Sequence, residues 1–254
     1  MKAYLPNFLK FKTAEDLIRI GRKNDGGYLI SKKDIQLSDF LISFGVCDDW
    51  SFEEDILNHK RMPLIAYDGT ISLKTFFYNL FKSLLKLNNP RYLPYSIKKI
   101  ITYIIFFRGT KKHIKKNVSD KVKNNSNFIS IQDIFKTTSS KNIFLKIDIE
   151  GYEYRILEEL LNNEDRINGM VIEFHDCDLH LDKLKTFIQK LRLSIVHIHA
   201  NNYGNIESNQ EIPSVLEITF SKNSDFKKKY FLPHDLDMPN NPKAEEIILN
   251  FNEF

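Results

Sequence analysis

Acidic, imidazole and amide side chains follow three apolar runs in the second half of the chain. Each run becomes polar only near its end, as a strand does when its last residues reach the edge of a sheet. The runs are "NIFLKIDIEG" with Lys146, Asp148 and Glu150, "MVIEFHD" with Glu173 and His175, and "IVHIHANN" with His197, His199 and Asn201. An ordinary solvent-facing strand end explains any one of them, but three in succession favour a site.

Two kinds of chemistry suit these residue types. Nearby carboxylates raise the pKa of an imidazole and orient its ring, so His175 with Asp148 is a candidate general base. Alternatively, Asp148, Glu173 and His199 offer the mixed oxygen and nitrogen ligands that suit a divalent cation such as Mg²⁺ or Mn²⁺. Lys146 neutralises the nearby acids in either case. The residue pattern leaves both alternatives open.

The elements that carry these residues alternate between strand and helix. Helical patterns follow the first two runs, at "YEYRILEELLNN" and "LHLDKLKTFIQKLR". The last two strands, "LSIVHIHANNYG" and "SVLEITFSK", have no helix between them, which predicts an antiparallel edge pair. This alternation predicts an α/β fold with a mostly parallel open sheet, and such sheets bind ligands beyond the carboxyl ends of their strands.

An earlier strand–helix–strand unit supplies further candidates. "DFLISFG" is a buried strand that ends at Gly45, "SFEEDILNHK" is a helix, and "MPLIAYDGT" is a strand that ends at Asp68. Gly45 allows the backbone to approach a ligand closely. Asp68 stands where an acid accepts both hydroxyls of an adenosine ribose. The chain lacks a G-x-G-x-x-G sequence, which disfavours a hydride-transferring dinucleotide enzyme.

Composition indicates the class of protein. The 254 residues, 42% of them hydrophobic, suit a single α/β domain over residues 1–254 with one insertion. Two cysteines cannot form a disulfide framework, and Pro6 with scattered lysines interrupts the N-terminus where an export signal needs an apolar core. No apolar run approaches the roughly 18 residues of a membrane span. We therefore expect a cytoplasmic protein.

A basic segment interrupts the α/β pattern. Residues 71–123 carry 13 Lys or Arg and one acid, a net +12, whereas the remainder carries 24 basic and 32 acidic residues, a net −8. Isoleucines at helical spacing predict a helical insertion over about 71–112, with "RGTKKHIKKN" as a break after the helix. The insertion could cover the diphosphate of a nucleotide-linked sugar or attract an anionic glycan. It could instead contact an anionic membrane through residues 97–116. In the third alternative it has no binding role: its lysines face water and its isoleucines pack against the protein. The segment has the positive charge of a nucleic-acid-binding protein but no known nucleic-acid-binding motif, which disfavours a nucleic-acid partner.

Taken in order, the motifs resemble a known family. "FLKIDIEGYEYRILEEL" followed by "MVIEFHD" looks like the FkbM-type S-adenosylmethionine-dependent methyltransferases. "GRKNDGGYLI", "SFGVCDDWSFEEDI", "VHIHANNYG" and "PSVLEITF" resemble a subgroup found in bacterial surface-polysaccharide gene sets. The resemblance covers most of residues 20–220 outside the basic insertion. It implies a class I methyltransferase fold, a Rossmann-like seven-stranded mostly parallel sheet, with the cofactor across the first strand ends.

The resemblance also implies site residues. It places Asp148 and Glu150 beside the transferred methyl group. The loop "SFGVCDD" holds one glycine where many methyltransferases have two or three, so we expect more cofactor contacts from Ser43, Asp48 and Glu53. The full assignment is Asp148, His175 and Glu150 as catalytic residues, Ser43, Gly45, Asp48, Glu53, Asp68 and Asp25 as cofactor-binding residues, and His197, Asn201, Asn202 and Tyr28 as substrate-binding residues.

The family generally methylates hydroxyl oxygens, often on sugars. The resemblance therefore implies an O-methyltransferase acting on a sugar hydroxyl of a bacterial surface polysaccharide, on a nucleotide-linked precursor. The site chemistry agrees, because an alcohol needs a base or a cation to lose its proton as it attacks the sulfonium methyl. Two alternatives stay open: a methyltransferase of another small hydroxylated metabolite, and a degenerate, non-enzymatic domain that binds membrane or polyanion through the insertion.

Overall fold

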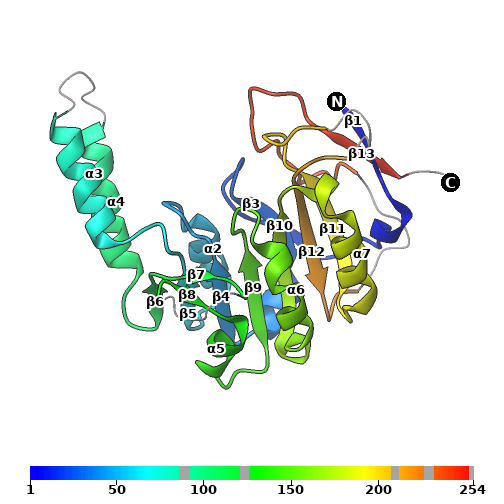
Figure 1. Ribbon diagram of the computed structural model, residues 1–254, viewed down its shortest axis with the longest axis horizontal. Coiled ribbons are helices and arrows are strands. Elements are labelled where there is room, and N and C mark those ends of the chain that lie inside the picture. The colour runs from blue at the N-terminus through cyan, green and yellow to red at the C-terminus, as the bar shows by residue number, and fades with distance from the viewer. Residues whose placement is uncertain (86–91, 121–125, 207–211, 226–231, 252–254) are drawn as a thin grey trace.

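The computed structural model (Figure 1) describes residues 1–85, 92–120, 126–206, 212–225 and 232–251. Its centre is a seven-stranded sheet in the order β11-β12-β10-β9-β4-β5-β6. All neighbouring strands in the sheet are parallel except β12, which runs antiparallel to β10 and β11. The strands are β4 (Phe40–Phe44), β5 (Leu64–Tyr67), β6 (Lys111–Ile114), β9 (Ile143–Ile147), β10 (Ile167–Phe174), β11 (Ser194–Ala200) and β12 (Leu216–Ser221).

This strand order confirms the predicted fold class. The chain runs from β4 outward through β5 to β6, and then returns to the other side of β4 with β9. The reversal creates a switch point between β4 and β9, where neighbouring parallel strands leave a crevice beyond their carboxyl ends. A mostly parallel seven-stranded sheet with one antiparallel strand next to its edge is the class I methyltransferase arrangement.

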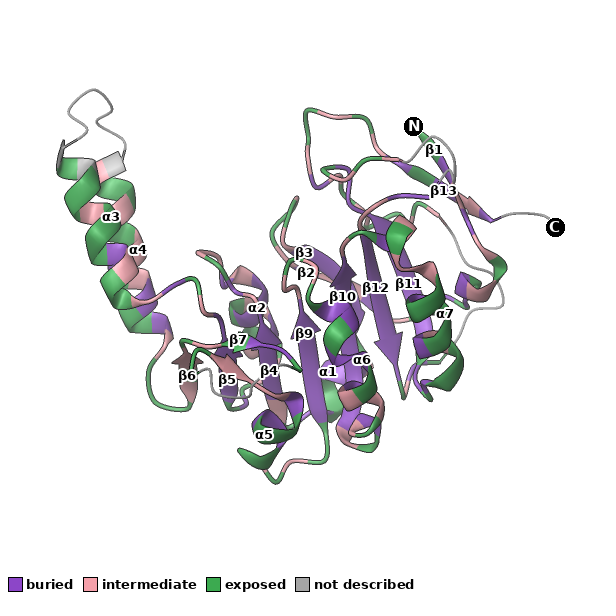
Figure 2. Cartoon of the chain, viewed as in Figure 1, coloured by how far each residue is buried: buried purple, intermediate pink, exposed green. Residues whose placement is uncertain are grey.

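Two helical layers cover the sheet. Strand β9 shows why: Phe144 packs into a core with α1 and α2, whereas Leu145 and Ile147 pack into the core on the opposite face with α5, α6 and α7. Alternation along the strand thus buries both faces, and the purple strands of Figure 2 show that burial. The helices are α1 (Lys32–Leu37), α2 (Ser51–His59), α5 (Ile131–Lys136), α6 (Glu153–Leu161) and α7 (Leu181–Lys190).

The basic insertion, expected to be helical, forms a hairpin of two helices, and its end differs from the prediction. Helices α3 (Leu73–Leu85) and α4 (Tyr92–Phe106) pack side by side beyond the edge of the sheet, and residues 86–91 of the insertion lie outside the described part. The segment interpreted as a break contains β6, which pairs with β5. Its sequence, KKHI, lacks an apolar run because β6 is an edge strand, and this is why the sequence did not reveal it.

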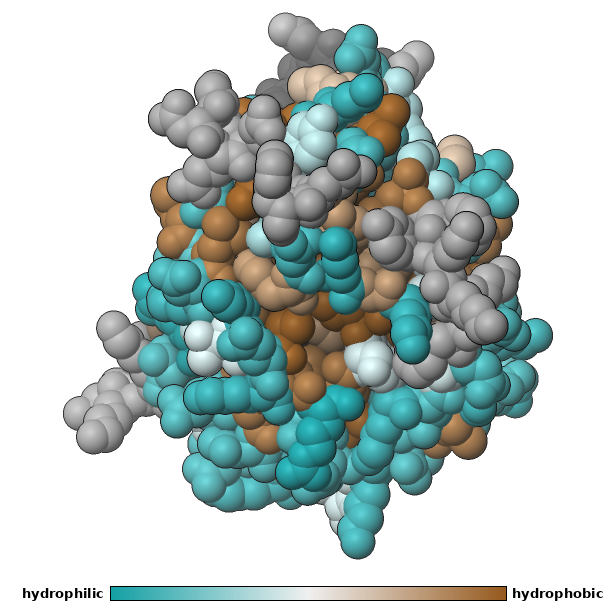
Figure 3. Space-filling model, turned by 90° about the vertical axis from the view of Figure 1, so that its right-hand side faces the viewer, coloured by the Kyte–Doolittle hydropathy of each residue, from teal (hydrophilic) through white to brown (hydrophobic). Residues whose placement is uncertain are grey.

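The two ends of the chain meet in a small separate sheet. Strand β1 (Lys2–Leu5) pairs in parallel with β13 (Ile248–Phe251). Figure 3 views this end of the molecule and shows polar side chains around an apolar central area. The remaining pairs are β2 (Leu17–Gly21) with β3 (Gly27–Ser31), and β7 (Asn117–Val118) with β8 (Phe128–Ile129).

The order of the last strands also refines a prediction. Strands β11 and β12 are antiparallel as expected, but β12 lies between β10 and β11 rather than at the edge. Glu217 of β12 is therefore in register with Glu173 on one side and with His199 on the other. Among the described helices, none has the length and apolar character that crossing a membrane requires.

Candidate active site

A cavity of about 280 Å³ opens where β4, β5 and β9 end. The loops after these strands form its walls, together with the segment that enters β7. Four of the residues assigned from the sequence line it: Gly45, Asp68, Asp148 and Glu150. Cys47, Tyr67, Gly69, Thr70, Lys116, Asn117, Val118, Ile149 and Tyr152 complete the lining. The cavity lies at the switch point, where the sequence predicted ligand binding.

Gly45 fixes the closest approach between two of these loops. Its φ of 72° lies in the left-handed region, and a Cβ added there would stand 1.6 Å from the carbonyl oxygen of Asp148. The buried Lys146 holds the same contact, because its Nζ donates to the Gly45 carbonyl and lies 3.2 Å from Asp148 Oδ2. Burial lowers the pKa of Lys146, but the charges of Asp148 and Glu53 outweigh burial and raise it. Lys146 is therefore a cation that positions Asp148.

Asp68 connects the first two loops of the sheet. Its Oδ2 accepts from the backbone N–H groups of Val46 at 3.0 Å and Cys47 at 2.7 Å. Its Oδ1 accepts from the backbone and hydroxyl of Thr70 and from the backbone of Ile71. Because protein donors already fill both oxygens, the carboxylate shapes the cavity wall, and a contact with ribose hydroxyls stays a prediction.

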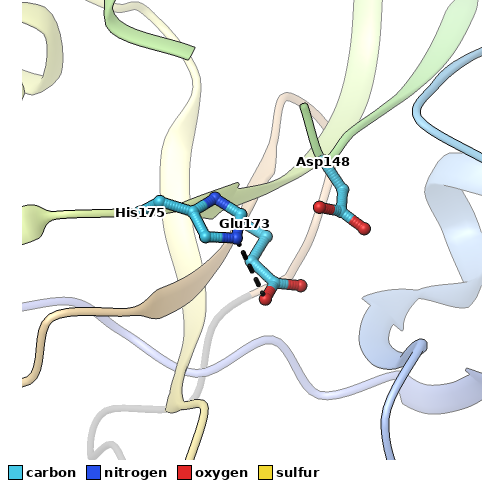
Figure 4. Close-up of side chains that lie close together, drawn as sticks. All are labelled: Asp148, Glu173 and His175. Atoms are coloured by element: carbon cyan, nitrogen blue, oxygen red, sulfur yellow. Dashed lines mark ion pairs between the residues drawn. The ribbon is translucent and has the colours of Figure 1, made fainter. Parts of the chain in front are cut away.

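Asp148, Glu173 and His175 form the candidate reaction centre (Figure 4). One ligand atom from each residue lies within 4.8 Å of the others. Asp148 follows β9, Glu173 lies near the end of β10, and His175 follows β10, so adjacent parallel strands bring the three together. The two ring nitrogens of His175 lie near different acids: Nε2 is 3.8 Å from Glu173 and Nδ1 is 3.2 Å from the buried Glu153.

The charge of His175 differs from what a general base requires. Burial lowers its pKa, but the hydrogen bond to Glu153 and the charges of Glu153, Glu173 and Asp148 outweigh burial and raise the pKa to about 9. The imidazole is therefore a cation at neutral pH. The expectation that His175 is the base is corrected here, because the same carboxylates that orient the ring also hold its proton.

Glu173 is a buried acid with two neutral donors. Tyr28 Oη donates to its Oε2 at 2.8 Å, and Asn201 Nδ2 donates to its Oε1 at 2.9 Å. Burial and the negative charges of Asp148 and Glu217 raise its pKa well above the usual value. Tyr28 and Asn201 were assigned to the substrate, but both hold Glu173 from inside the protein. Asp148 is therefore the most accessible carboxylate of the centre, with 25% of its side chain exposed.

The set of cation ligands proposed from the sequence is also corrected. His199 lies outside the cluster, because its Nδ1 contacts Glu217 at 3.1 Å and its Nε2 contacts Glu246 at 2.8 Å. His175 takes its place beside Asp148 and Glu173. These three residues suit a divalent cation only after His175 has lost its proton, since a metal binds the neutral imidazole.

Several residues assigned to the cofactor lie elsewhere. Ser43 and Glu53 are buried and hydrogen-bonded to each other beneath the first loop. The Asp48 carboxylate turns toward the insertion and accepts from Tyr95 Oη at 2.7 Å. Asp25 contacts the side-chain amides of Asn201 and Asn240. These four assignments are corrected: the residues support loops around the cavity rather than line it.

Two residues assigned to the substrate instead hold the C-terminal segment. His197 Nε2 lies 2.9 Å from Asp237 Oδ1. Asn202 Nδ2 donates to the carbonyls of Asn241, Ala244 and Glu245, and its Oδ1 accepts from the backbone of Asn241. Both side chains are buried, so their assignment to the substrate is corrected.

Sequence reasoning missed part of the cavity wall. Lys116 and Asn117 line it because they follow β6, the strand that the sequence did not reveal. Backbone geometry gives another signal: in the described part of the chain, the non-glycine residues with positive φ are Cys47, Glu150 and Asp176. Each follows one of three neighbouring strands, β4, β9 and β10, and such conformations cluster at functional sites.

Comparison with known proteins agrees with a methyltransferase. Residues 108–223, a little under half of the chain, match the "Methyltransferase FkbM domain" family. The match includes Asp148, Glu173 and His175. No curated protein matches the sequence.

Solved methyltransferase structures resemble the chain distantly. An rRNA methylase from Streptococcus thermophilus is 10% identical with a TM-score of 0.39, over 75% of this chain and 93% of that one. A precorrin-6y C5,15-methyltransferase from Geobacter metallireducens is 12% identical with a TM-score of 0.35, over 75% and 84% of the two chains. A Pyrococcus horikoshii protein described as an RNA methyltransferase is 8% identical with a TM-score of 0.40, over 75% and 78%. Residues 108–223 are thus similar to the FkbM methyltransferase domain.

Proposed function

We propose that the chain is an S-adenosylmethionine-dependent O-methyltransferase that methylates a sugar hydroxyl of a bacterial surface polysaccharide, acting on a nucleotide-linked precursor. The observation that carries this proposal is the position of Asp148. Its side chain lines the cavity at the switch point and lies within 4.8 Å of Glu173 and His175. The FkbM domain match over the same residues adds the reaction class.

The cavity suits the cofactor in shape and charge. The left-handed Gly45 leaves room where a Cβ would collide with the next loop, and the cavity wall is apolar at Tyr67 and Val118. The Gly45 loop and Asn117 would hold the nucleoside, and the carboxylates of Asp148 and Glu150 would complement the sulfonium charge. When bound, S-adenosylmethionine supplies a methyl group on a good leaving group.

The residues of the reaction centre then have different roles. Lys146 and the protonated His175 hold Asp148 and Glu173 in place. Asp148 would accept the proton of the substrate hydroxyl, and the bound cofactor would supply the methyl group that this oxygen attacks and retain the electron pair of its leaving sulfur. Because the reaction removes the positive charge of the sulfonium, the negative centre favours binding of the charged cofactor over its neutral product.

A second cavity supports a phosphate-bearing substrate. It measures about 480 Å³ and lies between α2 and the insertion. Asp49 lines it and Cys47 lines the first cavity, so one short loop separates the two. Its charged residues are Arg22, Lys98, Lys99, Arg108 and Lys111, with Asp49 and Glu54. The excess of cations, with Trp50 and Tyr95 beside them, suits the diphosphate and base of a nucleotide-linked sugar.

Calorimetry with S-adenosylhomocysteine tests the first step. We expect saturable binding and a rise in melting temperature. If neither is observed, the domain is not a methyltransferase and the alternative of a non-enzymatic binding domain takes its place. A screen of nucleotide-linked sugars with labelled methyl donor then tests the substrate. Transfer only to unphosphorylated hydroxylated metabolites would replace the sugar proposal with the other enzymatic alternative.

A chelator test separates the two ways of activating the hydroxyl. Because His175 is protonated at neutral pH, we expect methyl transfer by the protein's own residues to survive thorough EDTA treatment. Loss of activity that added Mg²⁺ or Mn²⁺ restores would instead assign Asp148, Glu173 and His175 to a cation. Magnesium-free buffer with the same ionic strength is the control.

A further inference from the structure

The hairpin of α3 and α4 extends away from the sheet. Figure 1 shows it rising beyond edge strand β6, on the same side as the carboxyl ends of β9 and β10. Its base is fixed to the body by Trp50, whose ring lies 6.4 Å from Phe76, 5.9 Å from Tyr103 and 6.2 Å from Phe106. At this base Tyr103 Oη also lies 2.7 Å from His113 Nδ1 of β6, and from there the two helices extend away from the sheet (Figure 2).

Both helices expose apolar side chains at helical spacing. On α3, Phe77, Phe81 and Leu84 follow each other at intervals of four and three residues and are 54%, 60% and 51% exposed. On α4, the exposed residues are Ile97, Ile101, Ile104 and Ile105, with Tyr95 near the start. A helical hairpin that is surrounded by water carries polar residues at such exposed positions. Packing between the helices explains the buried Ile100 but not the exposed rows.

The charge of the hairpin has one sign. Between residues 71 and 119 the sequence holds no Asp or Glu, and Lys74, Lys82 and Lys98 are exposed beside the apolar rows. Aromatic and aliphatic side chains flanked by lysines are the composition of segments that lie at the surface of anionic bilayers. Two copies joined symmetrically through their hairpins would bring like charges together, so the charge disfavours a second copy as the partner.

We propose that the α3–α4 hairpin binds the surface of a bilayer that contains anionic lipids. The exposed Phe, Leu and Ile side chains enter the boundary between headgroups and acyl chains, and the lysines contact lipid phosphates. The hairpin does not span the bilayer. Since it rises on the side of the sheet where β9 and β10 end (Figure 1), binding brings that side, which carries the candidate site, toward the membrane surface. The proposal does not depend on the substrate of the enzyme.

Sedimentation of the purified full chain with lipid vesicles tests the proposal. We expect strong binding to vesicles of phosphatidylglycerol and phosphatidylcholine, weak binding to phosphatidylcholine alone, and a large decrease at 0.5 M salt because charge attraction is screened. Phe81→Ser with Ile101→Ser should weaken partitioning at least tenfold. Leu37→Ser with Leu236→Ser is the matched control, since these residues are 46% and 41% exposed away from the hairpin.

A variant with fewer lysines tests the electrostatic part of the proposal. Lys74→Gln with Lys82→Gln should weaken binding several-fold on anionic vesicles and leave binding to phosphatidylcholine unchanged. Equal melting temperatures show that the variants fold. Two outcomes overturn the proposal. The first is equal vesicle binding by the hairpin and control variants. The second is that neither the wild type nor the hairpin variant binds vesicles, while light scattering shows a dimer for the wild type and a monomer for the hairpin variant.

Discussion

Asp148 is the residue on which the proposed chemistry depends most directly. It lines the cavity, and Lys146 holds it 3.2 Å away. We expect Asp148→Asn to lower the rate of methyl transfer by about 10²–10⁴-fold, because the amide cannot accept the hydroxyl proton. Affinity for S-adenosylhomocysteine in calorimetry should change little. Asp182→Asn on the exposed start of α7 is the control. A variant of Asp148 with more than a third of wild-type activity would exclude it as the base.

The protonation of His175 is measurable at the same scale. Its pKa of about 9 exceeds the ordinary 6.5, so the folded state binds more protons than the unfolded state in this window. The stabilisation is fully present below pH 6.5 and is lost as the pH rises through 9. We expect the free energy of unfolding to fall more steeply between pH 6.5 and 9 in the wild type than in His175→Gln. Urea unfolding over that range measures the difference.

A nuclear magnetic resonance titration identifies the cause of the shift. The His175 ring signal, assigned by its absence in His175→Gln, should titrate near pH 9. Glu153→Gln removes the carboxylate that lies 3.2 Å from Nδ1 and should lower that midpoint. A wild-type midpoint at or below 6.5 would contradict the argument and restore His175 as a candidate base.

At the scale of elements, the contact between the loops after β4 and β9 is a steric requirement. Gly45 and Gly109 both have positive φ, 72° and 64°, but a Cβ at Gly45 would stand 1.6 Å from a carbonyl oxygen and one at Gly109 would meet nothing within 4 Å. Gly109→Ala should therefore cost only about 1–2 kcal/mol for its left-handed backbone. We expect Gly45→Ala to lower the free energy of unfolding by more than about 3 kcal/mol and to weaken S-adenosylhomocysteine binding. Equal effects in urea unfolding would show that the loops separate easily.

The elements also show what the sequence can and cannot predict. Buried strands such as β9 carry continuous apolar runs, so their existence, order and polar ends were predictable, and with them Gly45 and Asp148. Edge strand β6 carries lysines and was missed, together with Asn117 after it. His199 was placed beside Asp148 because adjacent strands in sequence were assumed to be neighbours. Strand β12 enters between β10 and β11, and its Glu217 meets His199 first. Such strand insertion depends on contacts across the whole sheet.

At the scale of the whole molecule, the chain separates its charges and joins its ends. The basic hairpin stands beyond one edge of the sheet, and the β1–β13 pair lies at the opposite end (Figure 1). The segment before β13 passes over the ends of β11 and β12, where buried histidines hold it. Burial lowers the pKa of His199, but the hydrogen bonds that its ring donates to Glu217 and Glu246, with the charges of Glu217 and Asp237, outweigh burial and raise the pKa to about 10. His197 and His199 therefore tie this segment to β11 through Asp237 and Glu246.

Asn202 provides the test of that connection. Its side chain donates to three carbonyls of residues 241–245 and accepts from the backbone of Asn241, so Asn202→Ala leaves several partly buried polar groups without this partner. We expect a loss of about 2–4 kcal/mol in the free energy of unfolding. Trypsin should also cut the variant faster after Lys243, because the segment opens more often. Asn205→Ala, at an exposed position in the same loop, is the control and should leave both measurements unchanged. If the two variants behave alike, the β13 pairing and the contacts of His197 and His199 hold the C-terminal segment without a contribution from the Asn202 amide.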